Sequence, residues 1–96
     1  MSVYVIGQLK FLNEQSYRKY QSRFAEVFVK YNGRLLAADE NPIVLEGKWD
    51  KDKFVLMSFP DARNARRFLE SPEYTEISQD RKLGAETVAL LIEGLK

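Results

Sequence analysis

The sequence predicts an α+β fold in which a four-stranded antiparallel sheet carries two main helices on one face. Three observations predict it. Four segments are rich in the β-branched and aromatic residues that favour strands, and two others repeat apolar residues at helical spacing. These segments alternate in the order strand, helix, strand, strand, helix, strand. Because the chain has 96 residues, we expect residues 1–96 to form a single domain.

The first half of the chain supplies a strand, a long helix and a second strand. Residues 2–9 are predicted to form the first strand. Asn13 is expected to cap the helix that follows. The apolar face of this helix consists of Tyr17, Tyr20, Phe24, Val27, Phe28 and Tyr31. Asn32 and Gly33 supply a left-handed residue that ends the helix, and residues 34–39 form the second strand.

The second half repeats the pattern with two strands and a helix. Residues 43–46 are compatible with a short extended piece, and residues 53–59 with the third strand. Asp61 is expected to cap the second helix, and Ser71 a further short helix with proline at its first position. Residues 87–93 form the last strand. This order is that of the ferredoxin-like split βαβ arrangement.

Both faces of the predicted sheet are largely apolar. The first strand carries Val3 and Val5 on one side, and Tyr4 and Ile6 on the other. Two helices can cover only one face, and an antiparallel sheet that faces water is ordinarily polar on its outer side. We therefore expect the second face to pack against the same face of another copy, in a twofold-symmetric homodimer.

Cysteine and histidine are both absent from the chain. The composition therefore excludes disulfides, thiolate ligands and a cysteine nucleophile, and it removes the commonest general base and metal ligand. No carboxylate pair has the spacing of a metal site, and the glycines form no phosphate-binding motif. We expect no metal and no tightly bound cofactor.

The charges are nearly balanced, since 15 basic and 14 acidic residues leave a net charge of +1. This argues against broad electrostatic binding of nucleic acid or membranes. The N-terminus does not have the pattern of a signal peptide, and no stretch approaches the roughly 20 apolar residues of a membrane helix. A cytoplasmic location is the default expectation.

Five segments, taken in order, resemble domain-of-unknown-function family 1330, which belongs to the dimeric α/β-barrel superfamily. They are Tyr17-Arg-Lys-Tyr20, Tyr31-Asn-Gly-Arg34, Val44-Leu-Glu-Gly-Lys-Trp49, Ser58-Phe-Pro-Asp61 and Ser71-Pro-Glu-Tyr74. The resemblance implies a ferredoxin-like fold that dimerises sheet to sheet. It does not imply one activity, because the superfamily includes cofactor-free monooxygenases, haem-degrading enzymes, isomerases and ligand-sensing domains.

The chain departs from the family pattern at two places. Asn32-Gly33 stands where the family often has two glycines, a mild change because asparagine tolerates left-handed geometry. Phe68 stands where the family often has tryptophan, which alters the shape of any pocket beside the second helix. We therefore include Phe68 among the candidate substrate-binding residues.

Glu46 is the first candidate for a catalytic residue. It follows the apolar residues 43–45 and precedes a glycine, so its carboxylate is expected to be partly removed from water. A carboxylate in such a place can serve as a general acid or base. The alternative is a structural role, either an ion pair with a nearby arginine or a hydrogen bond that anchors the loop.

Arg81 and Tyr20 are the other candidate catalytic residues. Arg81 has the chemistry to bind a substrate carboxylate or to pair with Glu46. Tyr20 and Tyr74 can donate hydrogen bonds into a cleft, or fill the core with their hydroxyls satisfied locally. Tyr74 and Arg81 are seven positions apart and share one helix face, so this segment lines a pocket if that face looks toward Glu46. Otherwise it covers the core.

Trp49 completes the candidate substrate-binding residues, with Tyr74 and Phe68. As the single tryptophan it either stacks on a ligand or covers the hairpin or the dimer seam. Three functions stay open: a cofactor-free enzyme that acts on a small organic acid or aromatic compound, a non-catalytic dimer that binds a metabolite or a protein, and a structural Glu46–Arg81 pair without a ligand.

Overall fold

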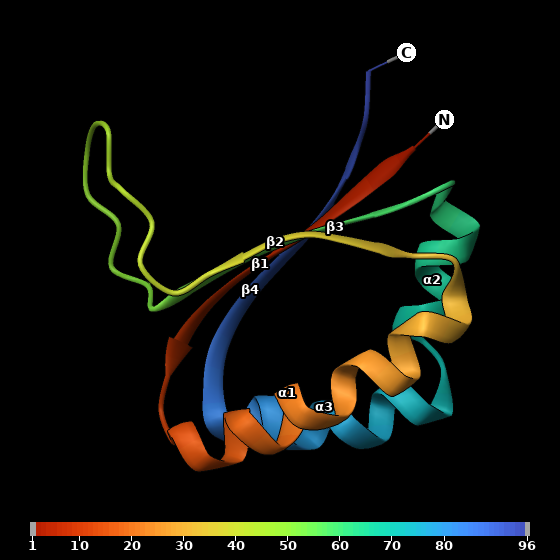
Figure 1. Ribbon diagram of the computed structural model, residues 1–96, viewed down its shortest axis with the longest axis horizontal. Helices are drawn as coiled ribbons and strands as arrows, with labels where there is room; N and C mark the ends of the chain where they lie inside the picture. The colour runs from red at the N-terminus through yellow and green to blue at the C-terminus, as the bar shows by residue number, and fades with distance from the viewer. Residues whose placement is uncertain (1, 96) are drawn as a thin grey trace.

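The computed structural model describes residues 2–95. In chain order its elements are β1 (Val3–Phe11), α1 (Glu14–Phe28), the 3-10 turn η1 (Val29–Tyr31), β2 (Arg34–Asp39), β3 (Lys53–Phe59), α2 (Ala62–Leu69), α3 (Pro72–Gly84) and β4 (Ala85–Glu93). The strands form one antiparallel sheet in the order β2-β3-β1-β4, and the helices lie on its concave side (Figure 1). The α+β, ferredoxin-like prediction is confirmed.

The three helix caps predicted from the sequence are all present. The side chains of Asn13, Asp61 and Ser71 accept hydrogen bonds from backbone N–H groups of the first helical turns. Each bond satisfies one of the N–H groups that a helix start leaves without a partner. The left-handed residue that follows η1 is Asn32, with φ of 61°. Gly33 is required for another reason, because a Cβ there would lie 2.5 Å from the Phe28 ring.

The main difference from the prediction is α3, which has thirteen residues and is longer than α2. Its sequence lacks a clean apolar stripe, because Tyr74, Ile77, Ser78 and Gly84 form its buried side. Gly84 allows a close approach to α1. A Cβ on Gly84 would lie 2.4 Å from the backbone nitrogen of Tyr17. The elements therefore follow the order β-α-β-β-α-α-β.

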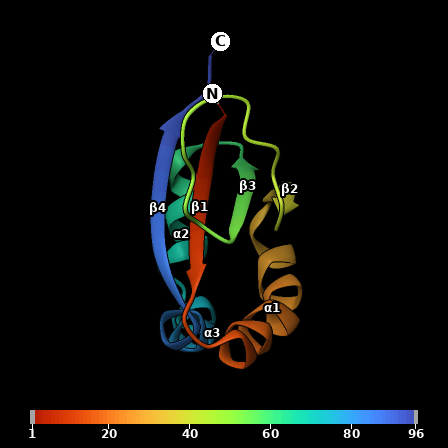
Figure 2. The same ribbon diagram turned by 90° about the vertical axis from the view of Figure 1, so that its left-hand side faces the viewer.

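A second difference concerns the segment between β2 and β3. Residues 43–46 form no strand, and residues 40–52 make a loop that projects from the sheet, away from the helices (Figures 1 and 2). Gly47 has a φ of 86°, so it turns this loop as the sequence predicts. The apolar side chains of Ile43 and Leu45 are 86% and 94% exposed, so they supply no buried face to a strand.

The core lies between the sheet and the helices. Its centre is Phe68, which has no exposed surface and whose ring centroid lies 4.5 Å from that of Tyr74. The opposite face of the sheet is apolar and uncovered. On β4 it presents Val88, Leu90 and Ile92, which are 46%, 49% and 43% exposed. The prediction of two apolar sheet faces is therefore confirmed, with helices on one of them.

Within residues 2–95, every helix is too short or too polar to cross a membrane.

Candidate functional site

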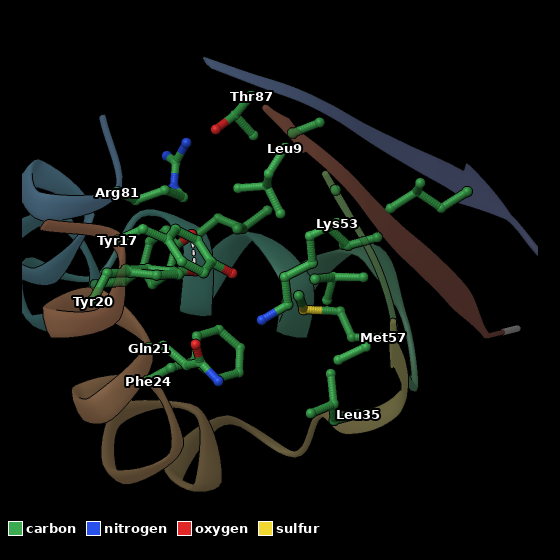
Figure 3. Close-up of a pocket in the computed structure, with 18 of the residues that line it drawn as sticks. Leu9, Tyr17, Tyr20, Gln21, Phe24, Leu35, Lys53, Met57, Arg81 and Thr87 are labelled. Carbon is green, nitrogen blue, oxygen red and sulfur yellow. Dashed lines mark hydrogen bonds between the residues drawn. The ribbon is translucent and has the colours of Figure 1, made fainter. Parts of the chain in front are cut away.

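A cavity of about 490 Å³ lies between the sheet and helices α1 and α3. Side chains from all four strands line one side of it, and α1 and α3 form most of the opposite wall (Figure 3). Most of the lining is apolar. The polar side chains in it are Tyr17, Tyr20, Gln21, Lys53, Tyr74, Arg81 and Thr87. Among the described residues, no aspartate or glutamate lines the cavity, so its two charged groups are both cations.

Arg81 and Thr87 bring unpaired polar atoms to one end of the cavity. Arg81 Nε and Thr87 Oγ1 are buried, and neither has a hydrogen-bond partner within residues 2–95. The Arg81 guanidinium carbon lies 6.0 Å from the centroid of the Tyr20 ring. Figure 3 shows both polar groups on the same side of Leu9. Buried polar groups ordinarily have partners, so these two atoms have hydrogen-bonding capacity that a bound water or a ligand would satisfy.

Lys53 supplies the second cation. It is the first residue of β3 and only 4% exposed. Its Nζ lies 3.7 Å from Glu40 Oε2 and 4.9 Å from the centroid of the Tyr17 ring. Burial lowers the pKa of the Lys53 amine below its usual value, and the nearby Glu40 carboxylate opposes this shift only in part.

Glu40 is held outside the cavity by Arg18. The Arg18 guanidinium donates to both carboxylate oxygens of Glu40, at 2.6 and 2.8 Å. These hydrogen bonds lower the pKa of the Glu40 carboxyl group. Glu40 is therefore an ionised partner for Lys53 and does not serve as a base inside the cavity.

Tyr20 and Tyr74 form a hydrogen-bonded pair at the wall of the cavity. Their hydroxyl oxygens are 3.0 Å apart and buried. Burial, with a smaller contribution from Tyr74, raises the pKa of Tyr20 well above its usual value. Each hydroxyl group has one hydrogen, and one of the two is used within the pair. The other takes no part in the pair.

A family model matches the whole described part of the chain. The model of the domain-of-unknown-function family DUF1330 matches residues 2–95. The chain belongs to this family. A search of curated proteins found no match.

Three solved structures share the fold of this DUF1330 chain. A protein of unknown function from Rhodopseudomonas palustris has 14% identity and a TM-score of 0.82, with coverage of 99% of this chain and 83% of its own. SnoaB, a cofactor-independent oxygenase from Streptomyces nogalater, has 13% identity and a TM-score of 0.69, covering 99% and 94%. A dimeric, ferredoxin-like protein of unknown function from Bacteroides fragilis has 14% identity and a TM-score of 0.65, covering 97% and 96%.

Three of the six site residues predicted from the sequence line the cavity of the DUF1330 chain. They are Tyr20, Tyr74 and Arg81. As the spacing of seven indicates, Tyr74 and Arg81 lie on one face of α3, and this face looks into the cavity. Helix α3 therefore lines a pocket, although Glu46 is not part of that pocket.

The other three predicted residues lie elsewhere in the chain. Glu46 is exposed on the loop of residues 40–52 and does not line the cavity. Among residues 2–95 it forms no ion pair with Arg81. Trp49 donates a hydrogen bond from Nε1 to Gln8 Oε1 at 3.0 Å, on the open side of the sheet. Phe68 lies in the core. The expected partial burial of Glu46 fails because its apolar neighbours are themselves in solvent.

The sequence interpretation missed Lys53 and Thr87. Both have a signal in the strand pattern, because side chains alternate between the two faces of a sheet. Lys53 shares its face with Met57 and Phe59, which are buried, and Thr87 follows the buried Ala85 by two positions. A charged residue in the core-facing set of a strand is the feature that indicates a functional group. Among residues 2–95, no cluster of acidic side chains has the arrangement of a metal site.

Proposed function

We propose that the cavity binds a small organic acid with an apolar or aromatic body. The main support is that Arg81 Nε and Thr87 Oγ1 are buried without a partner in the part of the chain that the structure describes. The cavity that they line has two cations and no carboxylate among its described residues. An arginine recognises a carboxylate through parallel hydrogen bonds, and the neighbouring hydroxyl adds a further donor. A carboxylate bound here satisfies both groups.

The rest of the cavity suits the body of such a ligand. Its volume of about 490 Å³ is within the range of small-molecule sites. Apolar side chains such as Leu9, Phe24 and Met57 line it, so an aromatic or aliphatic body gains from leaving water. The free hydrogen of the Tyr20–Tyr74 pair offers a polar contact that orients the ligand.

The proposal includes a homodimer that packs through the open sheet face. The uncovered apolar side chains of β4 support it, as does the dimeric ferredoxin-like protein from Bacteroides fragilis. An isologous contact brings the same patch from both copies together, which removes two apolar faces from water at once.

A cofactor-free enzyme that acts on the bound acid is a second candidate. The observation that favours it is the placement of Arg81 beside the tyrosine pair, because these donors can stabilise negative charge that develops on a substrate oxygen. The shared fold of SnoaB, named as a cofactor-independent oxygenase, is in keeping with this candidate. In such an enzyme the general acid or base is one of the residues that line the cavity, because Glu46 lies outside it.

A thermal-shift experiment tests the proposal. Wild-type protein, Arg81→Gln, Arg66→Gln and Glu46→Gln are each melted with benzoate, benzamide and a panel of small aromatic and aliphatic acids. We expect acids, and not the neutral amide, to raise the Tm of the wild type. A ligand at 100 times its Kd adds about 2.7 kcal/mol.

The variants locate the site. Arg81→Gln should lose the shift, whereas Arg66→Gln, which changes an exposed helix arginine, should retain it. Glu46→Gln should also retain it. An equal shift in Arg81→Gln, or no shift with any acid, would reject the proposal. Turnover by any acid that binds, measured by mass spectrometry of the products and reduced in Tyr20→Phe, separates an enzyme from a binding protein.

A further inference from the structure

Among the described residues that line the cavity, Lys53 is the only lysine. We propose that Lys53 is a covalent site, at which Nζ condenses with the aldehyde or ketone group of a small oxo acid to form an imine. This inference rests on the proposed function, because Arg81 and Thr87 are taken to hold the carboxylate of the same ligand. It narrows the ligand class from small acids to small acids that also contain an aldehyde or ketone group.

The position of Lys53 makes its amine available to a ligand. The side chain is buried, and Figure 3 shows its end directed into the cavity toward the wall formed by α1. The 3.7 Å separation between Nζ and Glu40 Oε2 is that of an ion pair and is too long for a good hydrogen bond. Nζ also lies over the Tyr17 ring, whose face offers no lone pair to accept a hydrogen bond. The amine is therefore held in place while its hydrogen-bonding capacity is not fully satisfied.

The surroundings of Lys53 also favour the neutral amine, which is the nucleophilic form. Burial is the larger cause, and the positive charge of Arg18 acts in the same direction. A surface lysine provides the contrast. Lys30 is exposed and pairs with Glu73, and this contact raises its pKa. At a given pH, Lys53 therefore has a larger neutral fraction than Lys30.

The proposed step is a condensation without any change of oxidation state. The lone pair of the neutral Lys53 amine attacks the carbonyl carbon and gives a carbinolamine. The former carbonyl oxygen then leaves as water, taking the two amine hydrogens, and a carbon–nitrogen double bond replaces the carbon–oxygen double bond. The apolar lining limits the access of water, which opposes hydrolysis of the imine.

Reductive trapping tests the proposal. Wild-type protein is treated with a limiting amount of 4-formylbenzoate in the presence of cyanoborohydride, which reduces an imine to a stable secondary amine. Peptide mapping by mass spectrometry then measures the labelled fraction of each lysine. We expect Lys53 to be labelled ahead of Lys30, despite its burial. Excess benzoate should slow labelling at Lys53 and leave Lys30 unchanged.

Two variants and a second probe make the result specific. Lys53→Met replaces the amine with an unbranched apolar side chain and should lose the cavity label. Arg81→Gln should reduce labelling of Lys53 by 4-formylbenzoate more than by benzaldehyde, which lacks the carboxylate. Circular dichroism checks that both variants fold, and benzoate competition in the wild type stands even if one does not.

The outcomes separate this inference from the proposed function. Labelling that simply follows exposure, with Lys53 unmodified while benzoate still stabilises the protein, would overturn the covalent site and leave acid binding intact. Absence of both effects would reject both proposals. If benzoate does not slow the labelling of Lys53, the proposal that Arg81 and Lys53 bind the same ligand is wrong.

Discussion

The hydroxyl oxygens of Tyr20 and Tyr74 lie 3.0 Å apart in the interior of the protein and join α1 to α3. These residues are separated by 54 positions in the chain. The pair stands at the cavity wall, beside the Arg81 guanidinium. It therefore links the packing of the two longest helices to the polarity of the candidate site.

Removing one hydroxyl of this pair should cost more than removing both. Tyr20→Phe leaves the Tyr74 hydroxyl buried without its partner, and we expect a loss of about 1–3 kcal/mol in the free energy of unfolding. Adding Tyr74→Phe removes the unsatisfied group, so the double variant should recover part of the loss. Urea unfolding of the wild type, the two single variants and the double variant measures the coupling between the two hydroxyl groups. Additive losses would contradict a direct hydrogen bond.

Gly84 should tolerate no side chain. A Cβ there would lie 2.4 Å from Tyr17 N and 2.9 Å from Asn13 O, which are backbone atoms of α1 and its cap. Gly84→Ala must push the helices apart, and we expect destabilisation of about 2 kcal/mol or more. Gly7→Ala is the matched control, because its Cβ would meet only Val55 Cβ at 3.9 Å. Comparable losses in the two variants, measured by urea unfolding, would contradict this packing.

Lys53 should give the protein a pH dependence that Lys53→Met lacks. The folded-state pKa of Lys53 is lower than its usual 10.5, so the unfolded chain binds more protons between these two values. The stability of the wild type should therefore rise relative to the variant as the pH increases through this window. At neutral pH the variant should be at least as stable, because a buried charge has been removed.

The comparison between wild type and Lys53→Met removes the contribution of other groups that titrate at alkaline pH. Burial raises the pKa of Tyr17 to about 12 and that of Tyr20 well above its usual value, which weakens both proteins as the unfolded chain ionises above pH 10. The measured quantity is the difference in urea midpoint between wild type and Lys53→Met across the pH range. A difference that stays constant would show that the Lys53 amine has an ordinary pKa in the fold.

A charge on the open sheet face should prevent association. Leu90 lies on β4 opposite Ile6 of β1 and is 49% exposed. In a dimer that covers this face, Leu90→Glu buries an unpaired carboxylate, so we expect a monomer in analytical ultracentrifugation. Leu83→Glu changes an exposed leucine of α3 and should leave the association unchanged. A wild-type monomer at micromolar concentration would contradict the proposed homodimer.

Much of the fold is predictable from local patterns. Asn13, Asp61 and Ser71 were identified as caps because their side chains bond to backbone groups only a few residues away. The bounds of β2 and β3 also match the prediction, because turn residues flank both strands. The length of α3 was underestimated, since α1 supplies the contacts that stabilise it and its own apolar periodicity is weak.

The sequence by itself determined the element order, the two apolar faces of the sheet and the absence of thiol and imidazole chemistry. It also placed Tyr74 and Arg81 on one helix face. Only the tertiary structure decided which charged groups share a cavity. Arg81 of α3 and Lys53 of β3 line the same cavity, whereas Glu46 is exposed on a loop outside it. The reason is physical: strand and helix patterns arise from neighbours along the chain, whereas a site depends on which segments pack together.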